Sequence, residues 1–262
     1  MDFNFNGKVM IATGAASGMG FLACKRFCEC GGAAVLADIN EEALANAVKE
    51  INESGGRAIG VKCDVRVYDD VVKTCNAAKE AFGSLDVVIN TAGGAEYRML
   101  NVSGQFPDVP IEVFDWSLDV NLRGQLYFCH AALKIMREQK TGVIINIGSI
   151  TGLEGSPTNV GYSASKSAAM NGLTKSIAQA GACYGDIRCV CVAPGPVLTR
   201  PGMANMKTVL GYAAMPEEIV EMFLYLVSPL ARSITGTTFL MDGGRDIMFN
   251  KFTGDYGKYD PE

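Results

Sequence analysis

Short apolar runs alternate with longer amphipathic segments along almost the whole chain. The apolar runs have the length of buried strands, whereas the segments between them repeat their apolar positions with the spacing of a helix. The predicted strands cover about residues 8–13, 33–38, 57–63, 85–89, 142–148, 187–192 and 237–241. The predicted helices cover about residues 19–30, 41–53, 68–82, 111–139 and 216–227, and a further helix carries Tyr162.

This alternation predicts an α/β fold. Because the strands are apolar on both faces, they should form a parallel sheet that helices cover on both sides. We expect a doubly wound, Rossmann-type sheet of about seven parallel strands. No linker, low-complexity segment or second core is visible, so residues 1–262 should form a single domain, with residues 245–262 as a C-terminal tail.

Composition and charge exclude several classes of protein. Of the 262 residues, 48% are hydrophobic, and the formal net charge is −5. No basic cluster suggests a nucleic-acid partner, and no apolar stretch is long enough to cross a bilayer. Residues 1–8 lack the basic and apolar regions of a signal peptide. We therefore expect a cytoplasmic protein without nucleic-acid or membrane partners.

The nine cysteines predict neither a disulfide framework nor a metal site. They lie mostly inside apolar helix or strand patterns, and no C-x-x-C spacing occurs, so we expect them to act as small core hydrophobes. The only histidine, His130, lies in an apolar helical run and should be a packed structural residue. We therefore expect no metal and no catalytic triad that depends on histidine.

A glycine-rich loop follows the first predicted strand and opens the first helix. Its sequence from Thr13 to Gly20 has the spacing G-x-x-x-G-x-G. Gly14 allows a tight turn, Gly18 lets the backbone approach a ligand, and Gly20 lets helix and strand pack closely. Strand, glycine-rich turn and helix together place backbone N–H groups where they can bind a pyrophosphate.

An acidic residue stands at the end of the second strand, about twenty positions after the loop. Asp38 can accept hydrogen bonds from an adenosine ribose diol and would repel a 2′-phosphate. Neither Ser17 nor the pair Ile39 and Asn40 supplies a cation that would favour such a phosphate. We interpret Asp38 as a residue that favours NAD as the cofactor. The alternative is that Asp38 only caps the helix that follows.

Tyr162 and Lys166 are four residues apart in an Ala/Ser-rich helical run, so their side chains share one face. An ammonium near a phenol favours the phenolate and lowers the pKa of the tyrosine toward the working range. Ser149, at the end of the fifth strand, can donate a hydrogen bond to a substrate oxygen. The three groups suit proton transfer to or from an alcohol or ketone, although this spacing alone also fits a surface helix with a solvated lysine.

Polar and glycine residues follow several of the predicted strands. In a parallel sheet, ligands bind beyond the carboxyl ends of the strands. The residues at these ends are Gly14, Asp38, Asp64, Asn90, Ser149 and Pro194. Their convergence at one edge predicts a single binding site.

These motifs, in this order, resemble the compact branch of the short-chain dehydrogenase/reductase superfamily from about residue 6 to residue 244. The resemblance implies that Tyr162 is the general acid/base, that Ser149 polarises the substrate oxygen, and that Lys166 lowers the pKa of the tyrosine. It also implies that Asn121 holds a water that links Lys166 to solvent. The cofactor-binding residues implied are Gly14, Ser17, Gly18, Met19, Gly20, Asp38, Ile39, Asp64, Val65, Asn90, Ala92, Gly93, Tyr162, Lys166, Pro194, Gly195, Val197 and Thr199.

The expected function is therefore an NAD(H)-dependent oxidoreductase that interconverts a secondary alcohol and a ketone. The short segment 200–215 after Thr199 suggests an open pocket, and Tyr97, Arg98, Met99, Phe106 and Pro107 could line its mouth. This favours a bulky alcohol such as a hydroxysteroid or bile acid. The alternatives are a sugar or polyol dehydrogenase, a 3-oxoacyl reductase and a non-catalytic dinucleotide sensor. A sugar-nucleotide epimerase shares the tyrosine and lysine, but it normally has a different glycine spacing and a larger C-terminal substrate region, and this chain has neither.

The resemblance also implies a homotetramer. The tail beyond Arg245 carries Phe249, Phe252, Tyr256 and Tyr259, and an aromatic tail of this kind favours packing at an interface between subunits.

Overall fold

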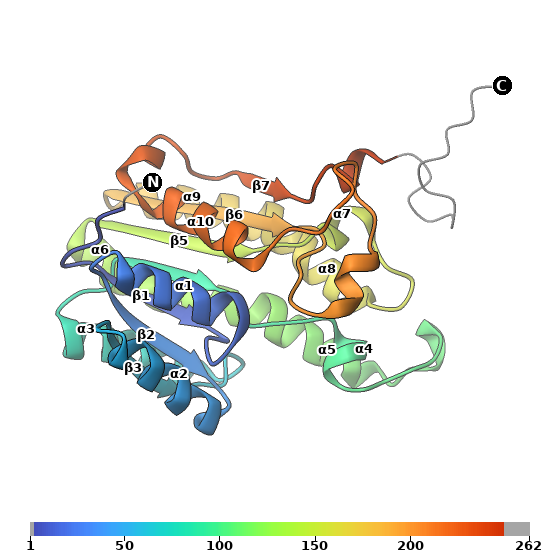
Figure 1. Cartoon of the computed structure of the whole chain (residues 1–262), viewed down its shortest axis with the longest axis horizontal. Coiled ribbons are helices and arrows are strands. Elements are labelled where there is room, and N and C mark those ends of the chain that lie inside the picture. Colours follow the sequence, from blue (N-terminus) through green and yellow to red (C-terminus); the bar gives the residue numbers. More distant parts are fainter. Residues whose placement is uncertain (1–2, 249–262) are drawn as a thin grey trace.

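The computed structural model describes residues 3–248, and a seven-stranded parallel sheet runs through them (Figure 1). The strands lie in the order β3-β2-β1-β4-β5-β6-β7. Their bounds are β1 Val9–Thr13, β2 Ala33–Asp38, β3 Arg57–Lys62, β4 Val87–Asn90, β5 Thr141–Ile147, β6 Asp186–Pro194 and β7 Thr238–Met241. The predicted fold class, a doubly wound sheet of parallel strands, is confirmed.

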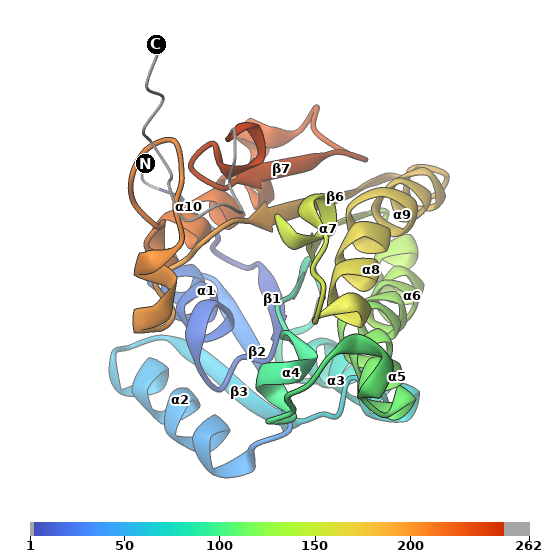
Figure 2. The ribbon, with the colours of Figure 1, turned by 90° about the vertical axis from the view of Figure 1, so that its right-hand side faces the viewer.

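The chain reverses its direction of travel across the sheet at β1. It first adds β2 and β3 on one side of β1 and then crosses over to place β4 on the other side, so that Ile11 lies between Val35 and Val88. Such a switch point opens a crevice beyond the carboxyl ends of the strands. All the parallel strands end at this edge of the sheet, which is the side that faces the viewer in Figure 2.

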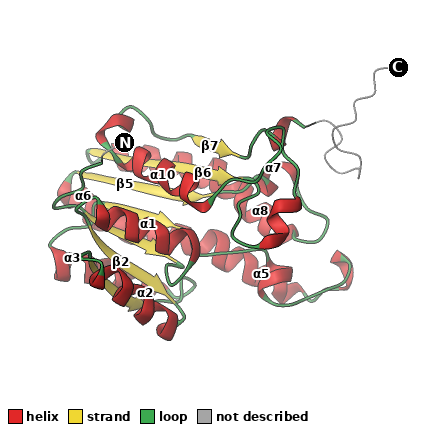
Figure 3. Ribbon diagram, in the orientation of Figure 1, coloured by secondary structure: helices red, strands yellow, loops and turns green. Residues whose placement is uncertain are grey.

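Helices cover both faces of the sheet, as the apolar strands require (Figure 3). On one face pack α1 Gly18–Glu29, α2 Glu41–Glu53 and α10 Pro216–Val227, around a core that includes Phe27 and Phe223. On the other pack α3 Tyr68–Phe82, α6 Gly124–Gln139 and α9 Thr174–Ala182, around a core that includes Phe128 and Ile144. The two cores are separated by the sheet.

The helix predicted over 111–139 is continuous in space but changes its winding in the middle. It consists of α5 Ile111–Leu118, the π-helical turn η2 Asp119–Arg123, and α6. The helix that carries Tyr162 changes in the same way, through α8 Val160–Ala168, the π-helical turn η3 Ala169–Leu173, and α9. A π turn accommodates an extra residue and reorients the side chains around it, which periodicity alone does not reveal.

Two short α-helices, α4 Glu96–Met99 and α7 Thr151–Glu154, were not predicted, because four residues are too few to show a helical repeat. The short 3₁₀ turns are η1 Phe106–Asp108, η4 Pro201–Asn205, η5 Pro229–Ala231 and η6 Arg245–Ile247.

Most of the cysteines are buried, as predicted, whereas the histidine is not. All nine thiols are free and most are buried; burial raises the pKa of Cys75 to about 12, so its thiol stays protonated. His130 is exposed rather than packed in the core, because it lies on the outer side of α6. There its Nδ1 lies 2.6 Å from the hydroxyl of Tyr68.

Within residues 3–248, no helix has both the length and the apolar character needed to cross a membrane.

Candidate active site

The structure brings Tyr162, Lys166, Ser149 and Asn121 to the carboxyl edge of the sheet. Tyr162 and Lys166 lie on α8, Ser149 follows β5, and Asn121 lies in the π turn η2. Helices α4, α7 and α8 gather around this edge in Figure 2. The fold therefore brings these four residues to the same edge.

Lys166 is held beneath the ring of Tyr162. Its Nζ lies 5.5 Å from the centre of the tyrosine ring and donates a hydrogen bond of 2.8 Å to the backbone oxygen of Ile147. The lysine side chain is buried, and this burial lowers its pKa to about 8. The surface-helix alternative with a solvated lysine is therefore wrong.

Several opposing effects set the pKa of Tyr162. Burial raises it, because the phenolate loses its hydration. Hydrogen bonding to Ser149 lowers it, as do the charges of Arg98 and Arg200, while the charge of Glu96 raises it again. On balance the pKa of Tyr162 is raised. The lowering by Lys166 that the sequence predicts remains a prediction.

Asn121 links two segments of the site. Its amide nitrogen donates to the backbone oxygens of Gly94 and Ser117, both at 3.0 Å, and its Oδ1 accepts from the N–H of Gly94 at 2.9 Å. Its backbone oxygen accepts from Gln125 and has a second lone pair. If Asn121 binds the predicted water, its backbone oxygen can accept a hydrogen bond from that water.

Sequence reasoning missed Glu96, a fully buried carboxylate that caps the helix of Tyr162. It accepts hydrogen bonds from the N–H groups of Gly161 at 2.9 Å and Tyr162 at 3.1 Å, and from the hydroxyl of Ser117 at 3.0 Å. Gly161 and Tyr162 hold the second and third positions of α8, whose N–H groups have no partner inside the helix. The residue at the usual capping position, Asn159, forms no side-chain hydrogen bond to the N–H groups of the first turn. Glu96 caps the helix instead, from a distant part of the chain.

We expect Glu96→Leu to lower the free energy of unfolding by about 2–4 kcal/mol, because it leaves buried N–H groups without an acceptor. Glu96→Gln keeps an acceptor oxygen and nearly the same volume, so its loss should be smaller, about 1 kcal/mol. Urea unfolding of both variants measures the difference. Equal stability of Glu96→Leu and the wild type would show that this contact does not hold α8 in place.

The glycine-rich loop has the geometry that its sequence predicts. Gly14 and Gly18 both have a φ of +60°, which favours glycine. A Cβ on Gly14 would lie 2.9 Å from Cα of Ala92, and one on Gly20 would lie 2.6 Å from the hydroxyl of Thr91. At Gly18, by contrast, no heavy atom lies within 4 Å of such a Cβ. Gly14 and Gly20 thus serve close packing, and the space above Gly18 is open.

Asp38 connects the end of β2 to the glycine-rich loop. Its Oδ2 accepts a hydrogen bond of 3.0 Å from the N–H of Ala16, and its Oδ1 accepts one of 2.9 Å from the N–H of Asn40. The cap of α2 is Asn40, whose side chain accepts from the N–H of Ala43 at 3.1 Å. The alternative that Asp38 caps α2 is therefore wrong.

The other predicted cofactor residues line the same edge. Asp64 forms an ion pair of 2.6 Å with Arg66, whose hydrogen bonds lower the pKa of the aspartate. Asn90, at the end of β4, is buried and donates to Asn146 at 2.9 Å. The remaining predicted residues lie in the glycine-rich loop, in the segments that follow β2, β3, β4 and β6, or at the last position of β6, namely Ser17, Met19, Ile39, Val65, Ala92, Gly93, Pro194, Gly195, Val197 and Thr199.

The predicted mouth residues form two groups. Tyr97 and Phe106 pack against Phe114, with ring centres 6.4 and 5.0 Å away, whereas Arg98 and Met99 are exposed on α4. Near the start of the tail, Arg245 is ion-paired at 3.0 Å with Glu154 of α7. The aromatic residues of the tail, Phe249, Phe252, Tyr256 and Tyr259, lie outside the described residues.

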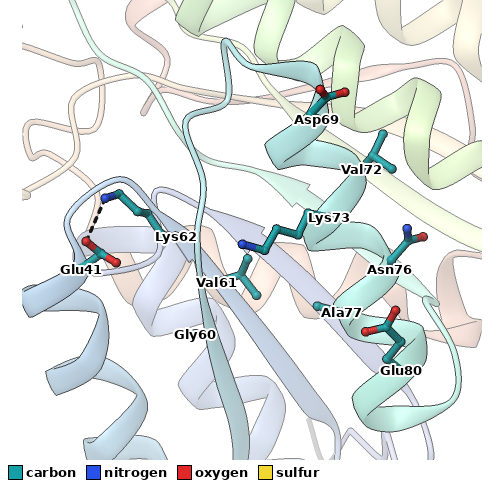
Figure 4. Close-up of a pocket in the computed structure, with 10 residues that line it drawn as sticks. All are labelled: Glu41, Gly60, Val61, Lys62, Asp69, Val72, Lys73, Asn76, Ala77 and Glu80. Atoms are coloured by element: carbon teal, nitrogen blue, oxygen red, sulfur yellow. Dashed lines mark hydrogen bonds and ion pairs between the residues drawn. The ribbon is translucent and has the colours of Figure 1, made fainter.

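A separate hollow lies away from this edge. It has a volume of about 710 Å³ and lies between the edge strand β3 and α3, where Val61, Val72 and Asn76 line it (Figure 4). Lys62 and Glu41 form an ion pair of 2.8 Å at one end of it. None of the predicted catalytic residues lines this hollow.

Comparison with known proteins identifies the family of the chain. The family model for short chain dehydrogenase matches residues 8–209. The chain belongs to the short-chain dehydrogenase family. Members of this family are oxidoreductases that use nicotinamide cofactors, so this chain is an oxidoreductase of that kind.

Two relatives of this short-chain dehydrogenase are hydroxysteroid dehydrogenases. It is 35% identical over 249 residues to a 3alpha-hydroxysteroid dehydrogenase of Mediterraneibacter gnavus, covering 90% of this chain and 96% of the relative. It is also 35% identical over 252 residues to 3beta-hydroxysteroid dehydrogenase 2 of Eggerthella lenta, covering 91% and 94%. The crystal structure of gox2181 matches with a TM-score of 0.83 and 28% identity, over 92% of this chain and 96% of that one.

Proposed function

We propose that this short-chain dehydrogenase is an NAD(H)-dependent enzyme that interconverts a secondary alcohol and a ketone. The observation that carries the proposal is the assembly of Tyr162, Lys166 and Ser149 at the edge where the glycine-rich loop also lies. A phenol beside a hydroxyl and above a buried ammonium is suited to exchange a proton with a substrate oxygen.

We propose the following roles for these residues. Ser149 orients the substrate oxygen and donates a hydrogen bond to it, and Tyr162 exchanges the hydroxyl proton. Lys166, fixed by Ile147, stabilises the phenolate and binds the ribose next to the nicotinamide. The bound cofactor would supply or accept the hydride.

The residues present fit a dinucleotide. The open space above Gly18 and the first N–H groups of α1 form a cradle of the kind that binds a pyrophosphate. Asp38 stands where a ribose diol would lie and favours NAD over NADP, because its charge would repel a 2′-phosphate. We propose NAD as the cofactor for this reason.

We expect Asp38→Ala to lower kcat/KM for NAD⁺ and raise it for NADP⁺, changing their ratio by about 10–100-fold, since a charge-assisted hydrogen bond contributes about 1.5–3 kcal/mol. Steady-state kinetics with both cofactors measure the ratio. The matched control is Asn40→Ala, which removes the cap of α2 and should leave the ratio unchanged. If both variants kept the wild-type ratio, Asp38 would only support the loop.

The substrate that we propose is a hydroxysteroid or bile acid. The two relatives named above act on hydroxysteroids, and the segment between Thr199 and Pro216 is short enough to leave the site open to a bulky ring system. Sugars or polyols and 3-oxoacyl thioesters are the alternatives, and a panel of all three classes distinguishes them. A non-catalytic sensor is less favoured, because Tyr162, Lys166 and Ser149 are assembled here.

We further propose that the protein is a cytoplasmic homotetramer with one catalytic domain over residues 1–262. Light scattering of the purified chain measures the number of subunits.

A further inference from the structure

Arg98 and Arg200 are charged side chains near the site that the proposed reaction does not use. Arg98 lies on α4, and Arg200 follows Thr199 after β6. Both are exposed, and among residues 3–248 neither has a carboxylate partner. Arg245, by comparison, is paired with Glu154. Two guanidiniums without counter-charges therefore stand at the mouth of the site.

The backbone of α4 holds Arg98 in a fixed place relative to Tyr162. Glu96, two residues before Arg98, is hydrogen-bonded to the first turn of α8, which also carries Tyr162. The short helix α4 is thus joined to the catalytic helix through a buried carboxylate. Arg98 therefore lies on a helix that is fixed to α8 and not on a free loop.

The guanidinium of Arg98 folds back toward the reacting groups. A Cβ added to Gly94 would lie 2.7 Å from its Nη2, so the guanidinium lies over the backbone of Gly94. A Cβ added to Gly93, the preceding residue, would lie 3.7 Å from Nζ of Lys166. Arg98 therefore lies over Gly94, and the neighbouring Gly93 faces Lys166.

The charges of Arg98 and Arg200 act on the pKa of Tyr162. Both guanidinium charges lower the pKa of Tyr162, and the effect of Arg98 is the larger. The pKa of Arg98 is lowered first by the partial burial of its guanidinium and then by the charge of Arg200. The two like charges therefore repel each other, and the carboxylate of Glu96 is bonded to α8 and Ser117. A bound anion would relieve the repulsion.

We propose that Arg98 and Arg200 form an anion subsite, and that the substrate is an alcohol or ketone that also carries a carboxylate. A planar guanidinium matches a carboxylate in shape and binds it through two parallel hydrogen bonds. This inference rests on the proposed function, since it concerns the substrate of the same site. Among hydroxysteroids, the proposed substrates are those with an acidic side chain.

The test compares one hydroxysteroid acid with its methyl ester, which differs only in charge. We expect the wild type to have a kcat/KM about 10–100-fold higher for the acid, as a charge-assisted hydrogen bond contributes about 1.5–3 kcal/mol. Arg98→Gln should remove most of this preference by raising KM for the acid, and any change in kcat that follows from the pKa of Tyr162 should be the same for the acid and the ester. Arg200→Gln should act in the same direction. The control is Arg137→Gln, at an exposed arginine in the last turn of α6, which should leave kcat/KM unchanged for both substrates.

Other outcomes separate the subsite from the reaction. Equal kcat/KM for acid and ester in the wild type would overturn the subsite. So would a rise in KM for NAD⁺ in Arg98→Gln with the acid preference kept, because the guanidiniums would then bind the cofactor. Calorimetry of the acid and the ester with the enzyme–NADH complex gives the same comparison without turnover. Acid binding that depends on Arg98, without any turnover, would support the subsite and contradict the proposed reaction.

Discussion

Tyr162→Phe should lower kcat for alcohol oxidation by about 10²–10⁴-fold, the range that a general acid/base contributes. The variant removes only the hydroxyl that exchanges the proton, so the ring still packs above Lys166. NADH binding, followed by fluorescence, should stay at the wild-type level. The expected loss therefore lies in the chemical step, and stopped-flow measurement of NADH formation detects it directly.

Tyr127→Phe is the matched control for this variant. Tyr127 lies on α6, packs edge-on against Tyr68 at 5.2 Å and is remote from Ser149 and Lys166. Removing its hydroxyl should leave kcat within about twofold of the wild type, because the substitution lies away from the site. Turnover retained by Tyr162→Phe would remove Tyr162 from the role of acid/base.

Lys166→Met should abolish most of the activity and at the same time stabilise the fold. The variant loses the ammonium that supports the phenolate, and we expect kcat to fall by about 10²-fold or more. It also replaces a buried charge by an apolar side chain of similar length, and such replacements are often stabilising by about 1–4 kcal/mol. We expect a gain of about 2 kcal/mol at pH 7, measured by urea unfolding.

The gain should decrease as the pH rises. Burial lowers the pKa of Lys166 from 10.5 to about 8, so between these values the unfolded chain binds more protons and the wild type becomes more stable with increasing pH. Below pH 8 the lysine is charged in both states, and the cost of burying it is present in full. The wild type should recover up to about 3 kcal/mol relative to Lys166→Met between pH 8 and 10.5. A difference that does not change with pH would mean that Lys166 is not buried as a charged group.

The sequence predicted the fold, and the position of Lys166 beside Tyr162, because these signals are local. Apolar runs mark the strands, and a helical spacing of four residues brings Lys166 beside Tyr162. The glycine spacing is also readable from the sequence, because each glycine has a steric reason. Gly14 and Gly18 have positive φ, and Gly20 packs too closely against its neighbours to allow a Cβ.

The contacts that the sequence could not reveal join distant segments. Glu96 caps α8 from 65 positions away in the chain, and α4 is too short to show a periodic pattern. The π turn at Asn121 looks like ordinary helix in the sequence, because its apolar spacing continues on both sides. His130 lies in an apolar helical run, yet it falls on the outer side of α6. Only the packing of the elements decides these positions.

The most direct test of the proposed reaction is NAD⁺ reduction at mildly alkaline pH across hydroxysteroids, polyols and sugars, and 3-hydroxyacyl esters, with Tyr162→Phe measured in parallel. We predict that NADH forms with an acidic hydroxysteroid and that the signal disappears in Tyr162→Phe. No NADH formation with any class, despite tight NADH binding, would contradict the proposed dehydrogenase and favour a dinucleotide sensor.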